Sequence, residues 1–160
     1  MNYLNFPMTR TLAFAVALLS ASISFAQAQA LPGTLTLASR HGFKTLVACV
    51  EAAVSSQKMG LVATASASAG AAARGVQIPG NTVLMVFRND YAVRMLQASV
   101  SAGIEAPLRL YVTENPDGTA SLTYRTPSAV FAPYQSEKIN AMARELDPVF
   151  ERIVRDAVSD

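Results

Sequence analysis

The chain has 160 residues, of which 51% are hydrophobic and 15% are charged, with 13 lysines and arginines against 11 acidic residues. Positive and negative charges are therefore nearly balanced. This balance excludes the basic surface of a nucleic-acid-binding domain or of a protein held on an anionic membrane. The single cysteine, Cys49, excludes an internal disulfide, so packing has to stabilise the fold. Its position in an apolar helical pattern predicts a buried, inert thiol.

The first residues have the pattern of a cleavable export signal, and residues 1–28 are predicted to be a signal peptide. Arg10 is the only charged residue before the apolar stretch 11–25, and small residues three apart then favour cleavage after Ala28 or Ala30. A membrane-spanning helix needs about 18 or more apolar residues, so no permanent membrane anchor is expected. The alternative is an uncleaved anchor or an amphipathic first helix.

The remainder, 29–160, is long enough for a single domain, which is predicted to be periplasmic or secreted. Alternating residues predict a first strand over 34–39, and helical spacing of apolar residues predicts a helix over 43–58. A second strand is predicted over 61–66. The short alanine-rich helix that follows, over 69–74, is expected to be capped by Ser68.

The stretch 82–88 is almost continuously apolar, which is typical of a central strand buried on both faces. Asn89 and Asp90 are then expected to cap a helix over 91–100. The predicted core face of that helix consists of Ala92, Met95, Leu96 and Ser99.

Two further strands, over 108–113 and 119–125, flank an Asn-Pro-Asp-Gly turn and therefore form an antiparallel hairpin. An apolar stripe predicts a last helix over 136–158, with a kink at Pro148 or a break at which Asp147 caps a new start. This order predicts an α+β fold, namely a two-layer sandwich. Its sheet is expected to be mixed, mainly antiparallel and of about five strands, with helices packed on one face.

A three-residue turn loop would fix the register of the hairpin. The apolar face then pairs Val112 with Leu122 and Leu110 with Tyr124. The other face pairs Thr113 with Ser121, Tyr111 with Thr123 and Arg109 with Arg125.

Two arginines directly opposite one another repel by up to roughly 1 kcal/mol, so some form of relief is expected. Water and salt can supply it, and so can a carboxylate, such as that of Glu105 or Glu114, from the same chain or a second copy. A third possibility is a small anionic ligand. The residues predicted to hold it on the polar sheet face are Arg109, Arg125, Tyr111 and Thr123.

Several motifs carry a family resemblance. The segment 95–109 (MLQASVSAGIEAPLR) joins a Leu-Met-Gln-Ala-like run to a Leu-Pro-Leu-Arg-like strand, and Asp-Gly at 117–118 precedes Tyr-Arg-Thr-Pro at 124–127. These elements resemble the domain-of-unknown-function 302 family over about residues 34–157. The resemblance implies an α+β fold, frequent homodimers and no settled biochemical activity.

The chain departs from that family at two places. Where relatives commonly have Gly-Asn-Pro after the central strand, this chain keeps only Asn89 between Arg88 and Asp90. Where relatives often have an Asp-His pair, it has Ala67 and Ser68, so any role of that histidine is lost here. Asn89 and Ser68 therefore join the candidate ligand-binding residues.

No metal or other cofactor is predicted, because His41 has no second histidine or second cysteine to share a metal ion. The sequence favours an exported, non-enzymatic module that binds a small ligand or another protein and forms a homodimer through its sheet. One alternative is a small periplasmic enzyme, a hydrolase or isomerase using Ser68 or His41, which requires His41 to lie beside Ser68, Tyr124 or a carboxylate. Another is an accessory subunit of an envelope complex, which requires a large exposed apolar patch.

Overall fold

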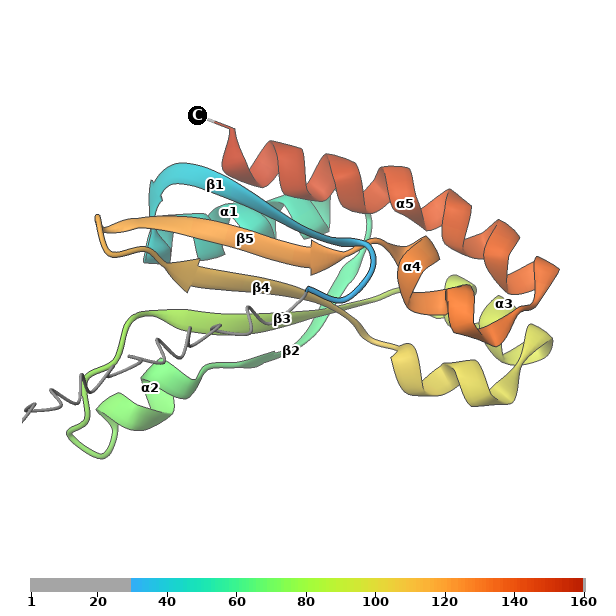
Figure 1. Cartoon of the computed structure of the whole chain (residues 1–160), viewed down its shortest axis with the longest axis horizontal. Helices are drawn as coiled ribbons and strands as arrows, with labels where there is room; N and C mark the ends of the chain where they lie inside the picture. The colour runs from blue at the N-terminus through green and yellow to red at the C-terminus, as the bar shows by residue number, and fades with distance from the viewer. Residues whose placement is uncertain (1–29, 160) are drawn as a thin grey trace, which may run out of the picture.

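The computed structural model describes residues 30–159 and contains one five-stranded sheet in which every neighbouring pair of strands is antiparallel (Figure 1). The predicted signal peptide, 1–28, lies outside the described residues. The strands lie in the order β1-β5-β4-β3-β2. Their bounds are Thr34–Gly42 for β1, Gly60–Ala65 for β2, Asn81–Phe87 for β3, Leu108–Glu114 for β4 and Thr119–Arg125 for β5.

The helices form the second layer, so the predicted two-layer α+β sandwich is confirmed. The α-helices are α1 (Phe43–Ser56), α2 (Ala67–Ala72), α3 (Asn89–Ala98), α4 (Pro127–Phe131) and α5 (Glu137–Val158). Two short 3₁₀ segments, η1 (Val100–Glu105) and η2 (Ala132–Tyr134), adjoin α3 and α4. In Figure 1 α1 lies behind the strands and α5 runs along the β1 side of the molecule.

The core lies between α1, α5 and one face of the sheet. The apolar stripe predicted for α5 is buried along its length, and Ile139, Phe150 and Ile153 have no exposed surface. From α1, Leu46 and Val50 meet it and are also fully buried. Burying side chains of this size stabilises a fold by about 1.5–3 kcal/mol each, which is how this domain is held together without a disulfide.

The β4–β5 hairpin has the predicted register. Val112 pairs with Leu122 and Leu110 with Tyr124, and all four side chains are buried. Gly118 has a φ of 83°, a left-handed conformation that glycine adopts without a Cβ clash. The turn therefore fixes which residues face the core and which face away from it.

Burial in β3 and α3 differs from the sequence-based prediction. β3 is not buried on both faces: its residues alternate between half-buried and buried, because no element within residues 30–159 forms a layer over the second face. In α3 only Met95 is buried, and Leu96, predicted to be a core residue, is 45% exposed. Cys49 on α1 is half-buried rather than fully buried.

The predicted helix caps were wrong by one or two residues. Ser66, not Ser68, accepts a hydrogen bond from the amide of Ala69 at the start of α2. α3 begins at Asn89, follows Arg88 and has no side-chain cap, so Asn89 and Asp90 do not cap it. These errors arise because the strand ahead of each helix ends earlier than its apolar pattern suggests.

Pro148 neither breaks α5 nor starts a new helix. α5 runs without interruption from Glu137 to Val158, and the neighbouring Val149 and Phe150 are buried in the core. Asp147, predicted to cap a second helix, instead accepts a hydrogen bond from the amide of Ser128 in α4, at 2.9 Å. No helix within residues 30–159 is long and apolar enough to cross a membrane.

Candidate functional site

The sheet face opposite α1 and α5, here called the open face, is the candidate site. It is open because the strands alternate: in β4 Leu108, Leu110 and Val112 are buried, whereas Arg109 and Tyr111 are exposed. The open face includes the side chains that alternate with the buried ones along the strands, among them Thr34, Thr36, Asn81, Val83, Arg109, Tyr111, Thr123 and Arg125. Four of the six candidate ligand-binding residues, Arg109, Arg125, Tyr111 and Thr123, therefore do lie on one surface.

The two arginines of the hairpin differ in their partners. The guanidinium of Arg125 donates to the carbonyl oxygens of Pro32, at 3.3 Å, and Ala129, at 3.1 Å. The Arg109 side chain is exposed, and within residues 30–159 it has no hydrogen bond or ion pair. Backbone carbonyls thus hold Arg125 in place, a form of relief that the sequence did not predict.

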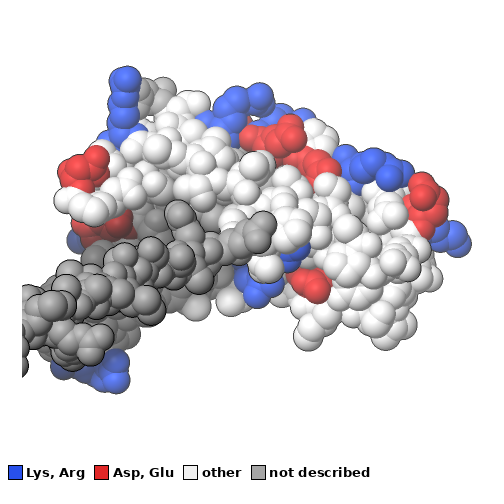
Figure 2. Space-filling model, in the orientation of Figure 1, with Lys and Arg blue, Asp and Glu red and all other residues white. Residues whose placement is uncertain are grey.

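The two acidic residues predicted as alternative partners of the arginines are engaged elsewhere. Glu105 accepts a hydrogen bond from the hydroxyl of Tyr134 at 3.0 Å, and Glu114 accepts one from the amide of Gly80 at 2.7 Å. The open-face positions of the five strands carry arginines but no aspartate or glutamate. The open face therefore has a local positive charge, although charges of both signs are scattered over the visible surface of the molecule (Figure 2).

A row of hydroxyl groups crosses the open face beside Arg109. Tyr111 pairs with Thr123 on β5, and Thr123 pairs with Thr36 on β1, where the two threonine hydroxyls lie 2.8 Å apart. Tyr111 is 40% exposed, so its ring and hydroxyl are accessible from solvent. This row offers hydroxyl donors on the same face as a guanidinium. Carboxylates and phosphates bind well to that combination of hydrogen-bond donors.

A wide, shallow depression of about 530 Å³ adjoins this row towards β2. Tyr111 forms one wall and the junction of β2 with α2 forms the other. Its lining residues are Ala65, Ser66, Ala67, Asn81, Val83 and Tyr111. The depression has room for a small organic ligand, but the Asn81 side chain in its wall is engaged with the backbone: Oδ1 accepts from the Ala67 amide at 3.1 Å and Nδ2 donates to the Pro79 carbonyl at 3.0 Å.

Ser68 does not line that depression, because its hydroxyl is occupied by the start of β3. The Ser68 hydroxyl accepts a hydrogen bond from the backbone amide of Asn81 at 3.1 Å and donates one to the backbone carbonyl of Asn81 at 3.2 Å. The Ser66 hydroxyl also donates to that carbonyl, at 2.6 Å, and lies 3.0 Å from the Ser68 hydroxyl. Ser66 and Ser68 thus fasten α2 to β3, and this role explains why two serines stand there.

Asn89 is not brought to the other candidate residues. It is exposed at the start of α3, beyond the end of β3, whereas Ser68 binds Asn81 at the beginning of the same strand. A seven-residue strand at about 3.3 Å per residue separates the two by more than about 20 Å. The structure therefore assigns Asn89 no place on the open face.

His41 lies near the end of β1, where its ring Nε2 donates to the carbonyl oxygen of Ser159 at 3.0 Å. Ser68 is bound to β3, and β5 and β4 lie between β1 and β3. At about 4.8 Å per strand this places the two residues roughly 14 Å apart or more. The contacts of His41 do not include Ser68, Tyr124 or a carboxylate among the described residues, as the predicted enzyme would require.

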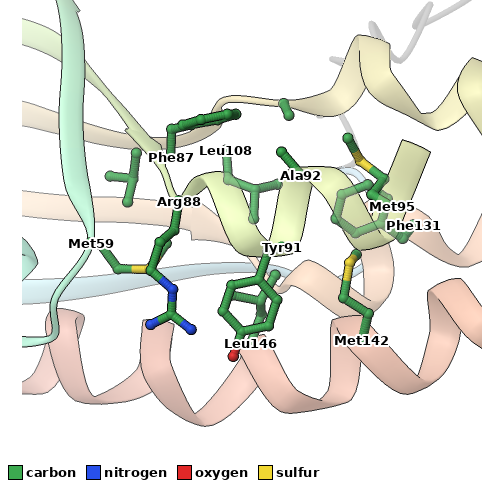
Figure 3. Close-up of a pocket in the computed structure, with 12 residues that line it drawn as sticks. Met59, Phe87, Arg88, Tyr91, Ala92, Met95, Leu108, Phe131, Met142 and Leu146 are labelled. Carbon is green, nitrogen blue, oxygen red and sulfur yellow. The ribbon is translucent and has the colours of Figure 1, made fainter. Parts of the chain in front are cut away.

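A more enclosed hollow lies elsewhere, between α3, α5 and the ends of β3 and β4 (Figure 3). It is lined by apolar side chains, among them Met59, Phe87, Met95 and Met142, and Arg88 and Tyr91 stand at its rim. Arg88 lies 4.3 Å from the Tyr91 ring and pairs with Asp90, which holds the pKa of that carboxyl below its usual value. The cavity volume of about 30 Å³ accommodates about one water.

Two tyrosines around the core have raised pKa values. Burial, together with the charges of Glu151 and Asp147, raises the pKa of Tyr124. Burial also raises the pKa of Tyr134, and the hydrogen bond to Glu105 adds to the effect. Both shifts favour the neutral phenol. Neither group faces the open face, so they bear on stability rather than on ligand binding.

No group of three or more His, Cys, Asp or Glu residues within 30–159 is arranged to hold a metal ion.

Two residues of the site, Asn81 and Ser66, were missed from the sequence. Asn81 immediately precedes the apolar run of β3, and Ser66 precedes Ser68 by two residues, but neither position is distinctive by itself. Their shared place became evident only from the pairing of β3 with β2, which brings Val83 beside Ala65. Strand order across a sheet is a long-range property that local patterns do not encode.

The fold and the open face together define a two-layer α+β domain with one accessible sheet face. Residues 35–157 match the model of the domain of unknown function DUF302, and the chain belongs to that family. The crystal structure of an uncharacterized conserved DUF302 protein from Bacillus stearothermophilus is similar, with a TM-score of 0.71 at 15% identity. That similarity covers 79% of this chain and 98% of the other, and it supports the fold. The curated proteins contain no match to this chain.

Proposed function

We propose that this protein is an exported, non-enzymatic binding module that holds a small anionic ligand on the open face of its sheet and works as a homodimer. The observation that supports the ligand proposal most strongly is that the Arg109 side chain is exposed and unpaired among the described residues. Arg109 shares the open face with Tyr111 and Thr123, where the strand positions carry no carboxylate.

The chemistry of this surface suits a carboxylate or a phosphate. Arginine presents a planar fork of donors that matches both anions, and the neighbouring hydroxyls add further donors. Arg125 contributes positive charge rather than direct contacts, because its donors are directed to Pro32 and Ala129. The depression beside Tyr111 gives the rest of a small ligand room along β3.

Melting temperatures in different anions test this proposal. The wild-type protein is expected to melt at a higher temperature in dicarboxylate, phosphate or sulfate than in chloride of equal ionic strength. Arg109→Gln and the double variant with Arg125→Gln should lose that difference. Arg74→Gln, which removes an exposed arginine from the end of the α2 region, is the matched control and should keep it. Equal melting of wild type and double variant in all these buffers would remove the ligand proposal.

Export is a separate part of the proposal, and it is supported by the uncharged apolar stretch after Arg10 and the small residues that follow. N-terminal sequencing of the protein recovered from outside the cytoplasm is expected to begin at Gln29 or Leu31. Recovery of an intact Met1 would contradict it.

A second candidate, an accessory subunit of an envelope complex, is supported by a different surface. Val93 and Leu96 in α3 and Val100 and Ile104 in η1 are exposed apolar residues, with exposed fractions of 45%, 45%, 79% and 83%. Exposed apolar residues that gather on one surface are typical of protein-binding sites. Replacement of Val100 and Ile104 by aspartate should abolish any stable envelope assembly without lowering the melting temperature, and an unchanged assembly would contradict this role.

A further inference from the structure

The β2 edge of the sheet carries neither a charged residue nor a proline, two of the features that usually keep an edge strand from pairing. All six residues of β2 are exposed, and the strand has a neighbour on one side only, β3. No charged residue occurs from Met59 to Ala73, between Lys58 and Arg74, and β2 contains no proline. An edge strand presents unpaired backbone amides and carbonyls, and charges or prolines normally block their pairing with another strand.

The other edge of the sheet is protected. β1 follows Pro32 and carries Arg40, whereas both edge strands contain a β-bulge. Helix α5 also contacts β1 and runs along that side of the molecule (Figure 1). If two copies of this chain pair through their sheets, β2 is therefore the edge at which they can do so.

We propose that two copies of this chain pair antiparallel through β2, which joins their sheets into one of ten strands. This inference rests on the homodimer named in the proposed function and assigns its interface. A face-to-face dimer through the open faces is disfavoured, because it would bring the Arg109 and Arg125 side chains of both copies together without a carboxylate. The uncharged β2 edge meets its own copy without such repulsion.

The register of the pairing follows from a bulge in β2. Leu61 pairs with Val86 and Ala63 with Met85, so Val62 is an extra residue that interrupts the regular strand. The regular part is Ala63–Ala65, and a two-fold axis through its centre places Thr64 opposite the partner's Thr64. Threonine pairs directly across antiparallel strands are favourable.

Exposed apolar side chains stand at the start of β2, beside this short ladder. Leu61 and Val62, at the start of β2, are 37% and 52% exposed. Val76 and Ile78, between α2 and β3, are also exposed, at 49% and 43%. Pairing through β2 covers the apolar side chains of Leu61 and Val62 as well as backbone groups.

The pairing also completes the depression on the open face. Ala65 and Ala67 line the depression on its β2 side, which is the edge of the sheet. A partner strand beside β2 adds a wall there, so that two depressions lie next to each other across the axis. The ligand site proposed above is therefore expected to bind more tightly in the dimer than in the monomer.

Sedimentation equilibrium of wild type, Thr64→Lys and Thr36→Lys tests the assignment. Both threonines are exposed on edge strands, so Thr36→Lys on β1 is the matched control. Because a short edge buries little surface, wild type is expected to dimerise in a concentration-dependent way. Thr64→Lys should raise the dissociation constant of the dimer at least tenfold, and Thr36→Lys should leave it unchanged.

The outcomes separate the two proposals. A wild-type protein that is monomeric at every concentration would overturn the homodimer and this interface together. A dimer with unchanged affinity in Thr64→Lys would keep the homodimer and overturn the β2 interface. If Thr64→Lys does not fold, Thr64→Cys in a Cys49→Ser background serves instead: oxidation should join two chains through that position, whereas Thr36→Cys in the same background should stay monomeric. Equal cross-linking of the two variants would overturn the assignment.

Discussion

Val112 and Leu122 face each other across the β4–β5 hairpin, and neither side chain has any exposed surface. This pair fixes the register of the hairpin. It places Tyr111 and Thr123, one residue away on each strand, on the open face. The composition of the open face depends on that alternation.

Truncation of Leu122 should therefore be costly, whereas truncation of its neighbour should not. Leu122→Ala is expected to lower the free energy of unfolding by about 2–5 kcal/mol, because it leaves a cavity in the core. Thr123→Ala, on the open face, should lower it by less than about 1 kcal/mol. Urea denaturation followed by circular dichroism measures both, and equal losses would show that the hairpin has a different register.

The two arginines of the hairpin should differ in their effect on stability. Arg125→Ala removes hydrogen bonds to the carbonyls of Pro32 and Ala129 and is expected to cost about 1–2 kcal/mol. Arg109→Ala removes no such bond and also lowers the local positive charge, so stability should stay the same or rise slightly. Melting curves in low-salt chloride buffer compare the variants. A larger loss for Arg109→Ala would mean that the assignments of the two side chains are reversed.

The Ser66 hydroxyl is expected to stabilise the junction of β2 with α2. Ser66→Ala removes the cap on the amide of Ala69 and the hydrogen bond to the Asn81 carbonyl, at a cost of about 1 kcal/mol. Ser66→Thr keeps the hydroxyl and should restore most of the loss. A thermal melt of the three proteins decides the matter, since a Ser66→Ala protein as stable as wild type would show that the hydroxyl contributes nothing.

Stability should fall in alkali because of Tyr124 and Tyr134. The pKa of each phenol is raised by burial, so the folded protein holds the proton more tightly than the unfolded chain does. The resulting stability is present below the unfolded pKa of about 10 and is lost as pH rises through the folded pKa. Urea midpoints between about pH 8 and 11 should therefore fall less steeply in Tyr124→Phe than in wild type. Identical slopes would contradict a raised pKa for Tyr124.

Strand alternation and turn chemistry predicted most of the fold. The Asn115–Gly118 turn and the alternation beside it are local features, and they placed the hairpin and its faces correctly. α5 was predicted because its apolar stripe recurs at helical spacing over its whole length. The predicted break at Pro148 was wrong, because a proline inside a helix with a strongly packed face costs less than the burial of its neighbours provides.

The sequence-based predictions that were wrong concern features that depend on contacts between distant segments. The apolar run of β3 fits a strand buried on either one or both faces, and only the absence of a second helical layer decides between them. The partners of Arg125 come from Pro32, far away in sequence, and from Ala129 in α4, a helix that was not predicted. Asn89 was selected from a family motif, and the strand between it and Ser68 separates the two.

The measurement that tests the account most directly is a titration of the isotope-labelled protein with a dicarboxylate, followed by nuclear magnetic resonance. Saturable shifts are expected for the Arg109 side-chain Nε–H signal and for the backbone amides of Tyr111 and Thr123. Met95 and Met142, beside the apolar cavity, should show none, and the shifts should be lost in Arg109→Gln. Shifts that leave Arg109 unchanged, or that persist in Arg109→Gln, would contradict an anion site on the open face.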